Sequence, residues 1–250
     1  MKEVFEIKKV VAIIQARMGS TRLQGKVLKD LCGKTVLAHD IERVKQSKLV
    51  NEIVIATTIS KEDDAIVAES LNNGTKFYRG SEEDVLGRYY KAALENEADV
   101  VVRITSDCPL IDPYIADEII NYYLENNYDL VTNAGSDLGQ RTYPRGLDVE
   151  VFSFCILKEA HEKAKQLYQR EHVTPYIYEN SEKIYYYKNE VDYSRYRWTL
   201  DTEEDFQLIT EIYKELYEGR HDFYLDDVIK LFNRRPELYD INKHISQKKV

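Results

Sequence analysis

The feature that most constrains the fold is the alternation of short apolar runs with helical segments in the first half of the chain. Val10–Ile14 is an apolar, β-branched run, and Val36–Val44 has the apolar spacing of an amphipathic helix. The pattern continues with strands expected at 53–57, 76–79 and 99–104, and with helices expected at 61–72, 82–95 and 114–125. This alternation predicts βαβ units and an α/β fold, with a mainly parallel sheet covered by helices on both faces.

The second half of the chain is less regular. We expect strands at 130–133, 147–152 and 183–188, and helices at 158–167, 171–179, 202–217 and 225–233. No internal repeat, linker or low-complexity segment marks a boundary. Because 250 residues is close to the size at which one core stops growing, we expect a single domain over residues 1–250. Its second half, about residues 130–200, would be an elaboration on one sheet.

Composition excludes several classes of protein. The chain has 35 Lys and Arg against 44 Asp and Glu, a net charge of −9, so we expect no nucleic-acid partner. The longest aliphatic run, Val10–Ile14, is far below the roughly 20 residues of a membrane span, and we expect no membrane partner. The amino terminus does not resemble a secretory signal. Cys32, Cys108 and Cys155 have neither disulfide nor zinc-site spacing, which favours a reducing cytoplasm.

A basic loop that contains glycine follows the first expected strand. It reads QARMGSTRLQGK from Gln15 to Lys26. Glycine lets a backbone approach a ligand, and successive N–H groups can form an anion-binding nest. Ligands of open α/β sheets bind beyond the carboxyl ends of strands. A solvated basic surface loop is the alternative, but it fits an acidic chain poorly. We therefore expect the loop to bind a nucleoside triphosphate through Ala16, Arg17, Gly19, Ser20, Arg22 and Lys26.

A carboxylate follows the expected strand at 99–104. Asp107 would face the same crevice as the basic loop, and Mg²⁺ is typically held by one or two carboxylates together with substrate phosphates. Asp112 is the competing candidate, although Leu110 and Ile111 should carry the chain away from the crevice. A turn or helix cap ahead of Pro109 is the structural alternative for Asp107.

Several stretches together resemble a known family. ARMGSTRLQGK is similar to the amino-terminal signature of the sugar-acid cytidylyltransferases, which make CMP-linked sialic, pseudaminic, legionaminic and ketodeoxyoctonic acids. The nearest resemblance is to spore-coat polysaccharide biosynthesis cytidylyltransferase-like proteins. Supporting stretches follow in the expected order: RGSEEDVLGRY (79–89), RITSDCPL (103–110), PRGLDVEVF (144–152), REHVTPY (170–176) and WTLDTEED (198–205). Ser106 stands where the family often has glycine, and since serine is small we expect the turn to survive.

The resemblance implies a fold and a reaction. The fold is a Rossmann-like, glycosyltransferase-A-like nucleotidyltransferase fold with a mixed sheet, in a homodimer whose interface and acceptor pocket draw on the second half. The reaction transfers CMP from CTP to an anionic sugar acid and releases pyrophosphate, for surface or spore-coat polysaccharide synthesis. Mg²⁺ would bind Asp107 and Asp201, and Arg17, Lys26 and Asp107 would be catalytic. Asp201 or Thr202 is also expected to begin a helix, a role that can coexist with metal binding.

The stretch RGSEEDVLGRY resembles the family's region near the nucleotide base and the sugar. Arg79 is therefore a candidate nucleotide contact. The structural alternative is a capped helix with Ser81 as its N-cap and Asp84 three residues later.

Basic residues also gather between positions 141 and 172. A guanidinium pairs well with a carboxylate or phosphate, so we expect an anionic acceptor near Arg141 and the candidate acceptor residues Arg145, Asp148, Glu150, Arg170 and His172. These arginines could instead pair with Asp148, Glu150 or Glu171. His172 could be a general base, but we favour a substrate contact, and Cys108 is expected to serve packing.

Other functions stay open at the level of sequence. A glycosyltransferase that consumes a nucleotide sugar could share this fold, but it would usually need a DxD-like motif, and SDCP (106–109) has one aspartate. A cytidylyltransferase for a phosphorylated small alcohol is a further alternative. A non-catalytic binding protein is disfavoured by the presence of Arg17, Lys26 and Asp107.

Overall fold

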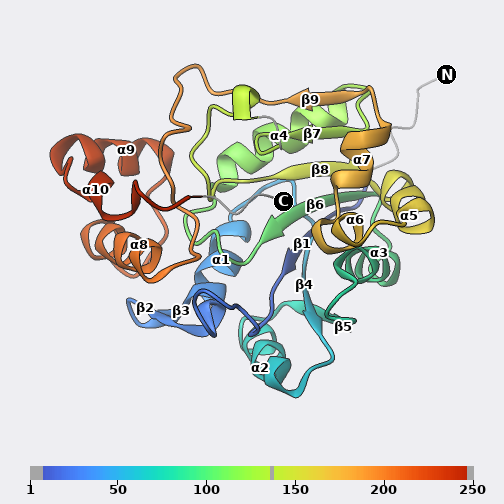
Figure 1. The fold of residues 1–250 in the computed structure, drawn as a ribbon, viewed down its shortest axis with the longest axis horizontal. Coiled ribbons are helices and arrows are strands. Elements are labelled where there is room, and N and C mark those ends of the chain that lie inside the picture. The colour runs from blue at the N-terminus through green and yellow to red at the C-terminus, as the bar shows by residue number, and fades with distance from the viewer. Residues whose placement is uncertain (1–7, 136–137, 247–250) are drawn as a thin grey trace.

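The computed structural model describes residues 8–135 and 138–246, and both halves of the chain contribute to one seven-stranded sheet. The strand order is β5-β4-β1-β6-β8-β7-β9 (Figure 1). The strands are β1 (Val10–Gln15), β4 (Glu52–Thr58), β5 (Lys76–Gly80), β6 (Val100–Thr105), β7 (Leu130–Thr132), β8 (Glu150–Ser153) and β9 (Ile184–Tyr186). All neighbouring pairs are parallel except those made by β8, which is antiparallel to β6 and β7. The predicted mixed, mainly parallel sheet is confirmed.

Helices cover both faces of this sheet. They are α1 (Val36–Val44), α2 (Asp64–Asn72), α3 (Val85–Glu95), α4 (Pro113–Glu125), α5 (Phe154–Lys163), α6 (Leu167–His172), α7 (Pro175–Asn180), α8 (Glu203–Leu216), α9 (Leu225–Arg234) and α10 (Leu238–Asn242). Short 3₁₀ turns η1 (Lys26–Leu28), η2 (Lys61–Asp63) and η3 (Leu138–Gln140) and a small hairpin of β2 (Asp30–Leu31) and β3 (Lys34–Thr35) complete the described structure.

Alternate residues of the central strand β1 face two different cores. Ala12 and Ile14 pack into the larger core with residues of α1, α4, α8 and α9. Val11 and Ile13 pack into the other core with residues of α3, α5 and α7. The period of two is the one expected of a strand buried on both faces. In Figure 1, α8, α9 and α10 form a group at one end of the molecule, and α3, α5 and α6 lie at the other.

The central strands agree closely with expectation, whereas some helix ends do not. The helix expected at 82–95 begins at Val85, because Asp84 rather than Ser81 is its N-cap: its side chain accepts a hydrogen bond from Gly87 N. The helix expected at 158–167 runs four residues earlier, from Phe154 to Lys163, after an N-cap at Ser153.

The single helix expected at 171–179 is in fact two helices, α6 and α7. Pro175 begins α7 and cannot continue a preceding helix, because it lacks a backbone N–H and restricts the residue before it. Among the described residues, none of the helices combines the length and apolar character needed to cross a bilayer.

Candidate active site

Two cavities open at the carboxyl ends of β1 and β6, where an open α/β sheet binds its ligands. The larger has a volume of about 540 Å³ and the smaller about 280 Å³. Their linings share Gln15, Arg22, Thr105, Asp107, His172 and Asp201. The shared residues include Asp107 and Asp201, which the sequence predicted as metal ligands, and Arg22, which it predicted as a nucleotide ligand.

The smaller cavity is lined by the basic loop after β1. Its lining includes every residue that the sequence assigned there: Ala16, Arg17, Gly19, Ser20, Arg22 and Lys26. Gly25 is needed for the turn that follows, because it has a left-handed φ of 62° as it caps η1. Ser106, where glycine was expected, also lines this cavity and does not have a positive φ, so serine adopts the turn without strain.

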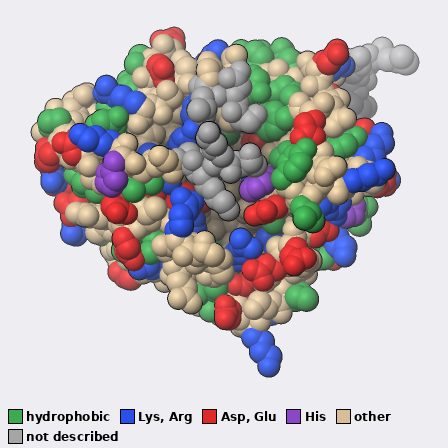
Figure 2. All heavy atoms as spheres, viewed as in Figure 1, with side chains coloured by type: hydrophobic (Ala, Val, Ile, Leu, Met, Phe, Trp, Pro, Cys, Tyr) green, Lys and Arg blue, Asp and Glu red, His purple; other side chains and the backbone are tan. Residues whose placement is uncertain are grey.

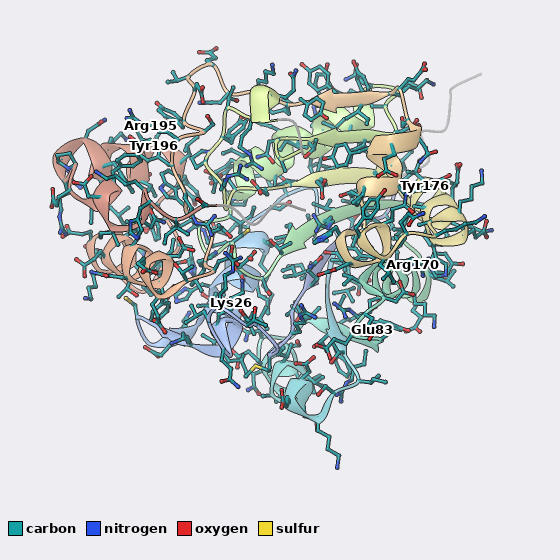
Figure 3. The ribbon with its side chains drawn as sticks, viewed as in Figure 1. Lys26, Glu83, Arg170, Tyr176, Arg195 and Tyr196 are labelled. Carbon is teal, nitrogen blue, oxygen red and sulfur yellow. The ribbon has the colours of Figure 1, made fainter. Side chains whose placement is uncertain are left out.

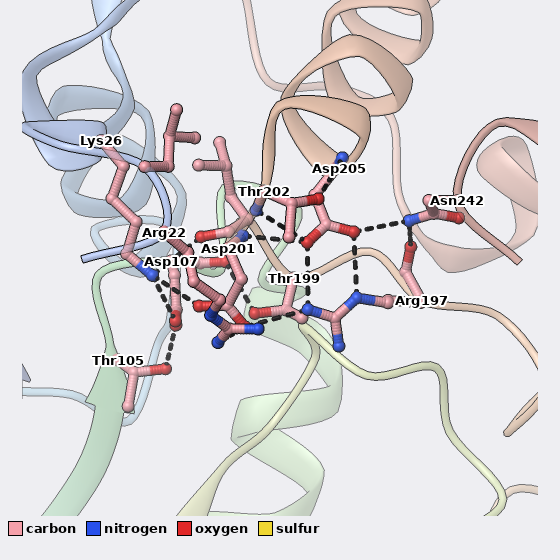
Figure 4. Close-up of polar contacts among 12 residues, drawn as sticks. Arg22, Lys26, Thr105, Asp107, Arg197, Thr199, Asp201, Thr202, Asp205 and Asn242 are labelled. Atoms are coloured by element: carbon pink, nitrogen blue, oxygen red, sulfur yellow. Dashed lines mark hydrogen bonds and ion pairs between the residues drawn. The ribbon is translucent and has the colours of Figure 1, made fainter. Parts of the chain in front are cut away.

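Lys26 lies at the junction between two carboxylates (Figure 4). Its Nζ is 3.0 Å from Asp107 Oδ2 and 2.8 Å from Asp201 Oδ1, and it donates to the carbonyl of Leu200 at 2.8 Å. Burial alone would lower the pKa of Lys26, but the two carboxylates outweigh it and raise that pKa. Burial would also raise the pKa of Asp107, yet Lys26 and the Thr105 hydroxyl hold it at about 2. Lys26 and Asp107 are therefore both charged at neutral pH.

Asp201 is held by a network that extends to the last helix. Arg197 donates to Asp201 Oδ2 at 2.9 Å and to both carboxylate oxygens of Asp205, and Asn242 of α10 donates to Asp205 Oδ1 (Figure 4). Asp205 also accepts from the backbone N–H of Thr202, which is the N-cap of α8. Thus the predicted helix start is confirmed at Thr202, and Asp201 lies just outside it with its side chain at the junction.

Two of the sequence motifs interlock behind the junction. Arg145 N donates to Tyr196 O at 3.1 Å, and Trp198 N donates to Arg145 O at 2.7 Å. Gly146 has a φ of 99°, and a Cβ there would lie 2.5 Å from the Trp198 carbonyl carbon. This close approach requires glycine in PRGLD and aligns that motif with RWTLD.

Most of the charges that line the larger cavity are paired. Buried Glu150 forms an ion pair with Arg103 and accepts a hydrogen bond from Tyr178 at 2.7 Å. Asp148 receives two donors from Arg141. Arg145 differs, since among the described residues its guanidinium has no hydrogen bond or ion pair. Burial, followed by repulsion from Arg141, lowers the pKa of Arg145 although Asp148 attracts it. The guanidinium is thus a positive charge in the cavity wall without an ion-pair partner in the described part of the chain.

Two arginines that the sequence assigned to ligands lie elsewhere. Arg79 donates to the carbonyls of Thr58 and Ser60 and pairs with Asp64, and it lines neither cavity. Arg170 pairs with the helix-capping Asp84 and donates to the His161 carbonyl, also outside both linings. Figure 3 shows Arg170 far from Lys26, on the side of Glu83. Arg145 and Arg170 belong to the same cluster of basic residues in the sequence. That cluster did not show that Arg145 lines the cavity whereas Arg170 does not.

His172 lines both cavities. The next residue, Val173, has φ 72° and ψ −57°, and Thr174 N donates to His172 O at 2.9 Å. This is a classic γ-turn, a rare and strained conformation for a β-branched residue. It separates α6 from α7 at the point where His172 reaches the cavities. Sequence reasoning missed it, because Val173 carries no turn signal.

Cys108 has the packing role expected of it. Its side chain is buried, and burial raises the pKa of the thiol well above its ordinary value. A neutral, buried thiol is a poor nucleophile.

The surface around the site has mixed charge. On the face in Figure 2, lysine and arginine side chains alternate with acidic ones. Nucleic-acid binders instead present a continuous basic patch or stripe.

Asp107 and Asp201 are the acidic groups that converge on one point at the junction. Among residues 8–135 and 138–246, no cluster of three or more His, Cys, Asp or Glu side chains could hold a metal ion. Two carboxylates nevertheless fit an ion that takes its remaining ligands from phosphates and water, as Mg²⁺ does.

Comparison with known proteins places the chain in a family. The cytidylyltransferase family model matches residues 11–240. An uncharacterized Methanocaldococcus jannaschii protein is 41% identical, covering 96% of this chain and 97% of its own. The spore coat polysaccharide biosynthesis protein SpsF of Bacillus subtilis is 32% identical, covering 91% and 95%. A 3-deoxy-manno-octulosonate cytidylyltransferase of Geotalea daltonii is 35% identical over 48% of this chain and 46% of its own.

A solved structure agrees over the whole chain. A cytidylyltransferase from Leptospira borgpetersenii is 36% identical, covers 97% of this chain and 100% of its own, and superimposes with a TM-score of 0.87. The resemblance found in the sequence motifs is confirmed, and nucleotidyl transfer is favoured over glycosyl transfer. The chain belongs to the cytidylyltransferase family.

Proposed function

We propose that the protein transfers CMP from CTP to an anionic sugar acid and releases pyrophosphate. The observation that carries this proposal is the meeting of two cavities at Lys26, Asp107 and Asp201. One cavity has the charge for a triphosphate, and the other has room for a sugar. The relatives named for spore-coat polysaccharide synthesis and for 3-deoxy-manno-octulosonate support a sugar acid as the acceptor.

The smaller cavity would hold CTP. Arg17, Arg22 and Lys26 would neutralise the triphosphate, and the backbone N–H groups of Gly19 and Ser20 would add hydrogen bonds. Catalysis of phosphoryl-type transfer depends mainly on such positioning and charge neutralisation.

Asp107 and Asp201 would hold Mg²⁺ at the junction. When bound, the ion would polarise the α-phosphate and stabilise charge on the leaving pyrophosphate. Lys26 now balances the two carboxylates, so it would move toward the phosphates as nucleotide and ion enter. Arg197 keeps Asp201 oriented in either state.

The larger cavity would hold the acceptor. Its hydroxyl oxygen bonds to the α-phosphorus while the bond from that phosphorus to the pyrophosphate oxygen breaks, and the hydroxyl proton is released to solvent. Arg145 would bind the acceptor carboxylate through two parallel N–H groups. Asp148 and Glu150, each already paired with an arginine, would fix the wall and offer oxygen acceptors to sugar hydroxyls. His172 would contact the acceptor beside the nucleotide.

The assembly and location of the enzyme belong to the same proposal. β9 is the edge of the sheet, and the partly buried rings of Tyr122, Tyr128 and Tyr185 cluster beside it. An open edge with aromatic side chains favours pairing with a second copy. We propose a homodimer, tested by light scattering, in the cytoplasm, where free thiols such as buried Cys108 persist.

A pyrophosphate-release assay tests the reaction. Each of CTP, UTP, ATP and GTP is offered with a panel of sugar acids, phosphorylated small alcohols and neutral sugars, with and without Mg²⁺. Release with CTP and a carboxylated sugar only, dependent on Mg²⁺, is expected. Turnover with a phosphorylated alcohol would assign Arg145 to a phosphate instead. Release with neutral sugars alone, or with purine nucleotides alone, would contradict the proposal.

A further inference from the structure

We infer that Arg88, rather than Arg79, is the nucleotide-reading residue of the stretch RGSEEDVLGRY, and that it recognises the O2 and N3 edge of cytosine. The inference rests on the proposed binding of CTP in the smaller cavity and adds the residue that selects the base.

The fold places Arg88 in the floor of that cavity. It lies in the first turns of α3, is only 2% exposed, and belongs to the cavity lining. Gly80 makes room for it, since a Cβ there would lie 2.8 Å from Arg88 Cγ. The glycine of RGSEED and the arginine of VLGR therefore form one local unit.

One side of the Arg88 guanidinium is fixed by the backbone. Its Nη1 donates to the carbonyls of Ser81 at 2.7 Å and Glu82 at 3.2 Å. The other two nitrogens, Nε and Nη2, form the side-on pair of donors, and no residue in the described ranges accepts a hydrogen bond from them. The backbone thus orients the group and leaves its bidentate side unused.

The charge of Arg88 is also uncompensated. No carboxylate in the described part of the chain lies within ion-pair distance of it, and Arg17 adds a second positive charge nearby. Burial, with repulsion from Arg17, lowers the pKa of Arg88, and the attraction of the more distant Asp63 and Glu82 does not outweigh it. Arg79 differs in every respect, because it has an acidic partner, accepting carbonyls and no place in the cavity. A buried guanidinium with unused donors is costly, and charge-assisted hydrogen bonds to a ligand would offset that cost.

The neighbouring residues favour a base over a phosphate. Ala16, Val27 and Val85 give the smaller cavity its apolar walls, whereas Gly19, Ser20 and Lys26 provide the phosphate-binding groups. Cytosine presents two adjacent acceptors, O2 and N3, which match two parallel N–H donors. Uracil carries a proton on N3, so its N3–H would face one of those N–H donors instead of accepting a hydrogen bond from it. Arg88 would therefore prefer CTP to UTP.

Calorimetric titration of the intact protein tests this inference without any turnover. CTP, UTP and inorganic tripolyphosphate are each titrated into the parent protein, Arg88→Gln and Arg88→Lys. Loss of two charge-assisted hydrogen bonds should weaken CTP binding by about a hundredfold or more. UTP should be affected much less, and tripolyphosphate should bind as before. Lys91→Met, which removes an exposed cation from the same helix, should change none of the three affinities.

Other results overturn the inference. An equal loss for CTP, UTP and tripolyphosphate would mean that Arg88 contacts phosphate. Unchanged CTP binding in Arg88→Gln, or a selective loss in Arg79→Met, would return the role to another residue. If Arg88→Gln does not fold, Arg88→Lys and Gly80→Ala keep the charge but disturb the donor pair, and must show the same selective loss. A parent protein that binds no nucleotide would instead contradict the proposed function itself.

Discussion

The two cavities balance their positive charges differently. In the larger cavity, Arg103 and Arg141 each have a carboxylate partner, and Arg145 remains without one. In the smaller cavity, Arg17 reaches only the exposed Glu82 at 3.3 Å, and Arg88 has no acidic partner among the described residues. Arg22 and Lys26 of the smaller cavity pair with Asp201, and Lys26 also pairs with Asp107. Within the part of the chain that the structure describes, each cavity therefore has one arginine without a carboxylate partner, and the other cations of the smaller cavity depend on the carboxylates of the junction.

The largest expected effect comes from the junction, which serves both cavities. Asp107→Asn should keep the fold but lower kcat by about 10² to 10³, by analogy with loss of one transition-state electrostatic contact. Asp201→Asn should act similarly. Pyrophosphate release at saturating CTP and acceptor measures it, with circular dichroism as the control for folding. Full activity of Asp107→Asn at low Mg²⁺ would show that this carboxylate is not a metal ligand.

Changes in the smaller cavity should affect the nucleotide alone. Arg17→Ala and Lys26→Ala each remove a charge-assisted contact worth about 1.5–3 kcal/mol, so the KM for CTP should rise about tenfold to a hundredfold. The acceptor KM should stay near the parent value. A comparable rise in both constants would mean that the cavities do not divide the substrates as proposed.

Arg145→Ala should give the complementary result in the larger cavity. The acceptor KM should rise by about tenfold or more, with little change in the KM for CTP. Arg170→Ala is the matched comparison, because Arg170 is paired with Asp84 and lies outside the cavity. It should lower the melting temperature and leave the acceptor constant nearly unchanged. A selective acceptor defect in Arg170→Ala alone would reverse the two assignments.

The smallest effect should come from behind the junction, where Asp40 of α1 is fully buried. Neither carboxylate oxygen has a hydrogen-bond partner among the described residues, and burial, with repulsion from Asp107, raises the pKa of Asp40 well above its ordinary value. The native state then keeps a proton that the unfolded chain releases. The free energy of unfolding should fall as pH rises above about 4, by up to about 1.4 kcal/mol per unit, until the native pKa is reached.

Asp40→Asn removes this titration. Its free energy of unfolding, measured in urea from pH 4 to 8, should exceed that of the parent by an amount that grows with pH. If the free energies of unfolding of the two proteins changed with pH in the same way, the pKa of Asp40 would not be raised in the native state.

The sequence predicted the central fold and most of the smaller cavity because both depend on local pattern. Strands such as Val10–Gln15 are continuous apolar runs, and the basic loop directly follows one of them. The residues that line the larger cavity were harder to predict, because the local sequence gives Arg145 and Arg170 the same basic character. Only the tertiary placement of Asp84, 86 residues from Arg170, shows that Arg170 belongs to the scaffold. The γ-turn at Val173 and the close approach of Gly146 to Trp198 likewise depend on distant packing.

The hydrogen bond from Asn242 has a consequence for synthesis of the chain. Asn242 donates to Asp205 and to the backbone carbonyl of Arg197, and the guanidinium of Arg197 in turn donates to the carboxylate of Asp201. A nascent chain can form the central sheet much earlier, since its last strand, β9, ends at Tyr186. The hydrogen-bond network behind Asp201 is therefore complete only when residue 242 has left the ribosome. A chain shortened before α10 would keep the strands of the sheet but would lose the hydrogen bonds from Asn242 to Asp205 and to the Arg197 carbonyl.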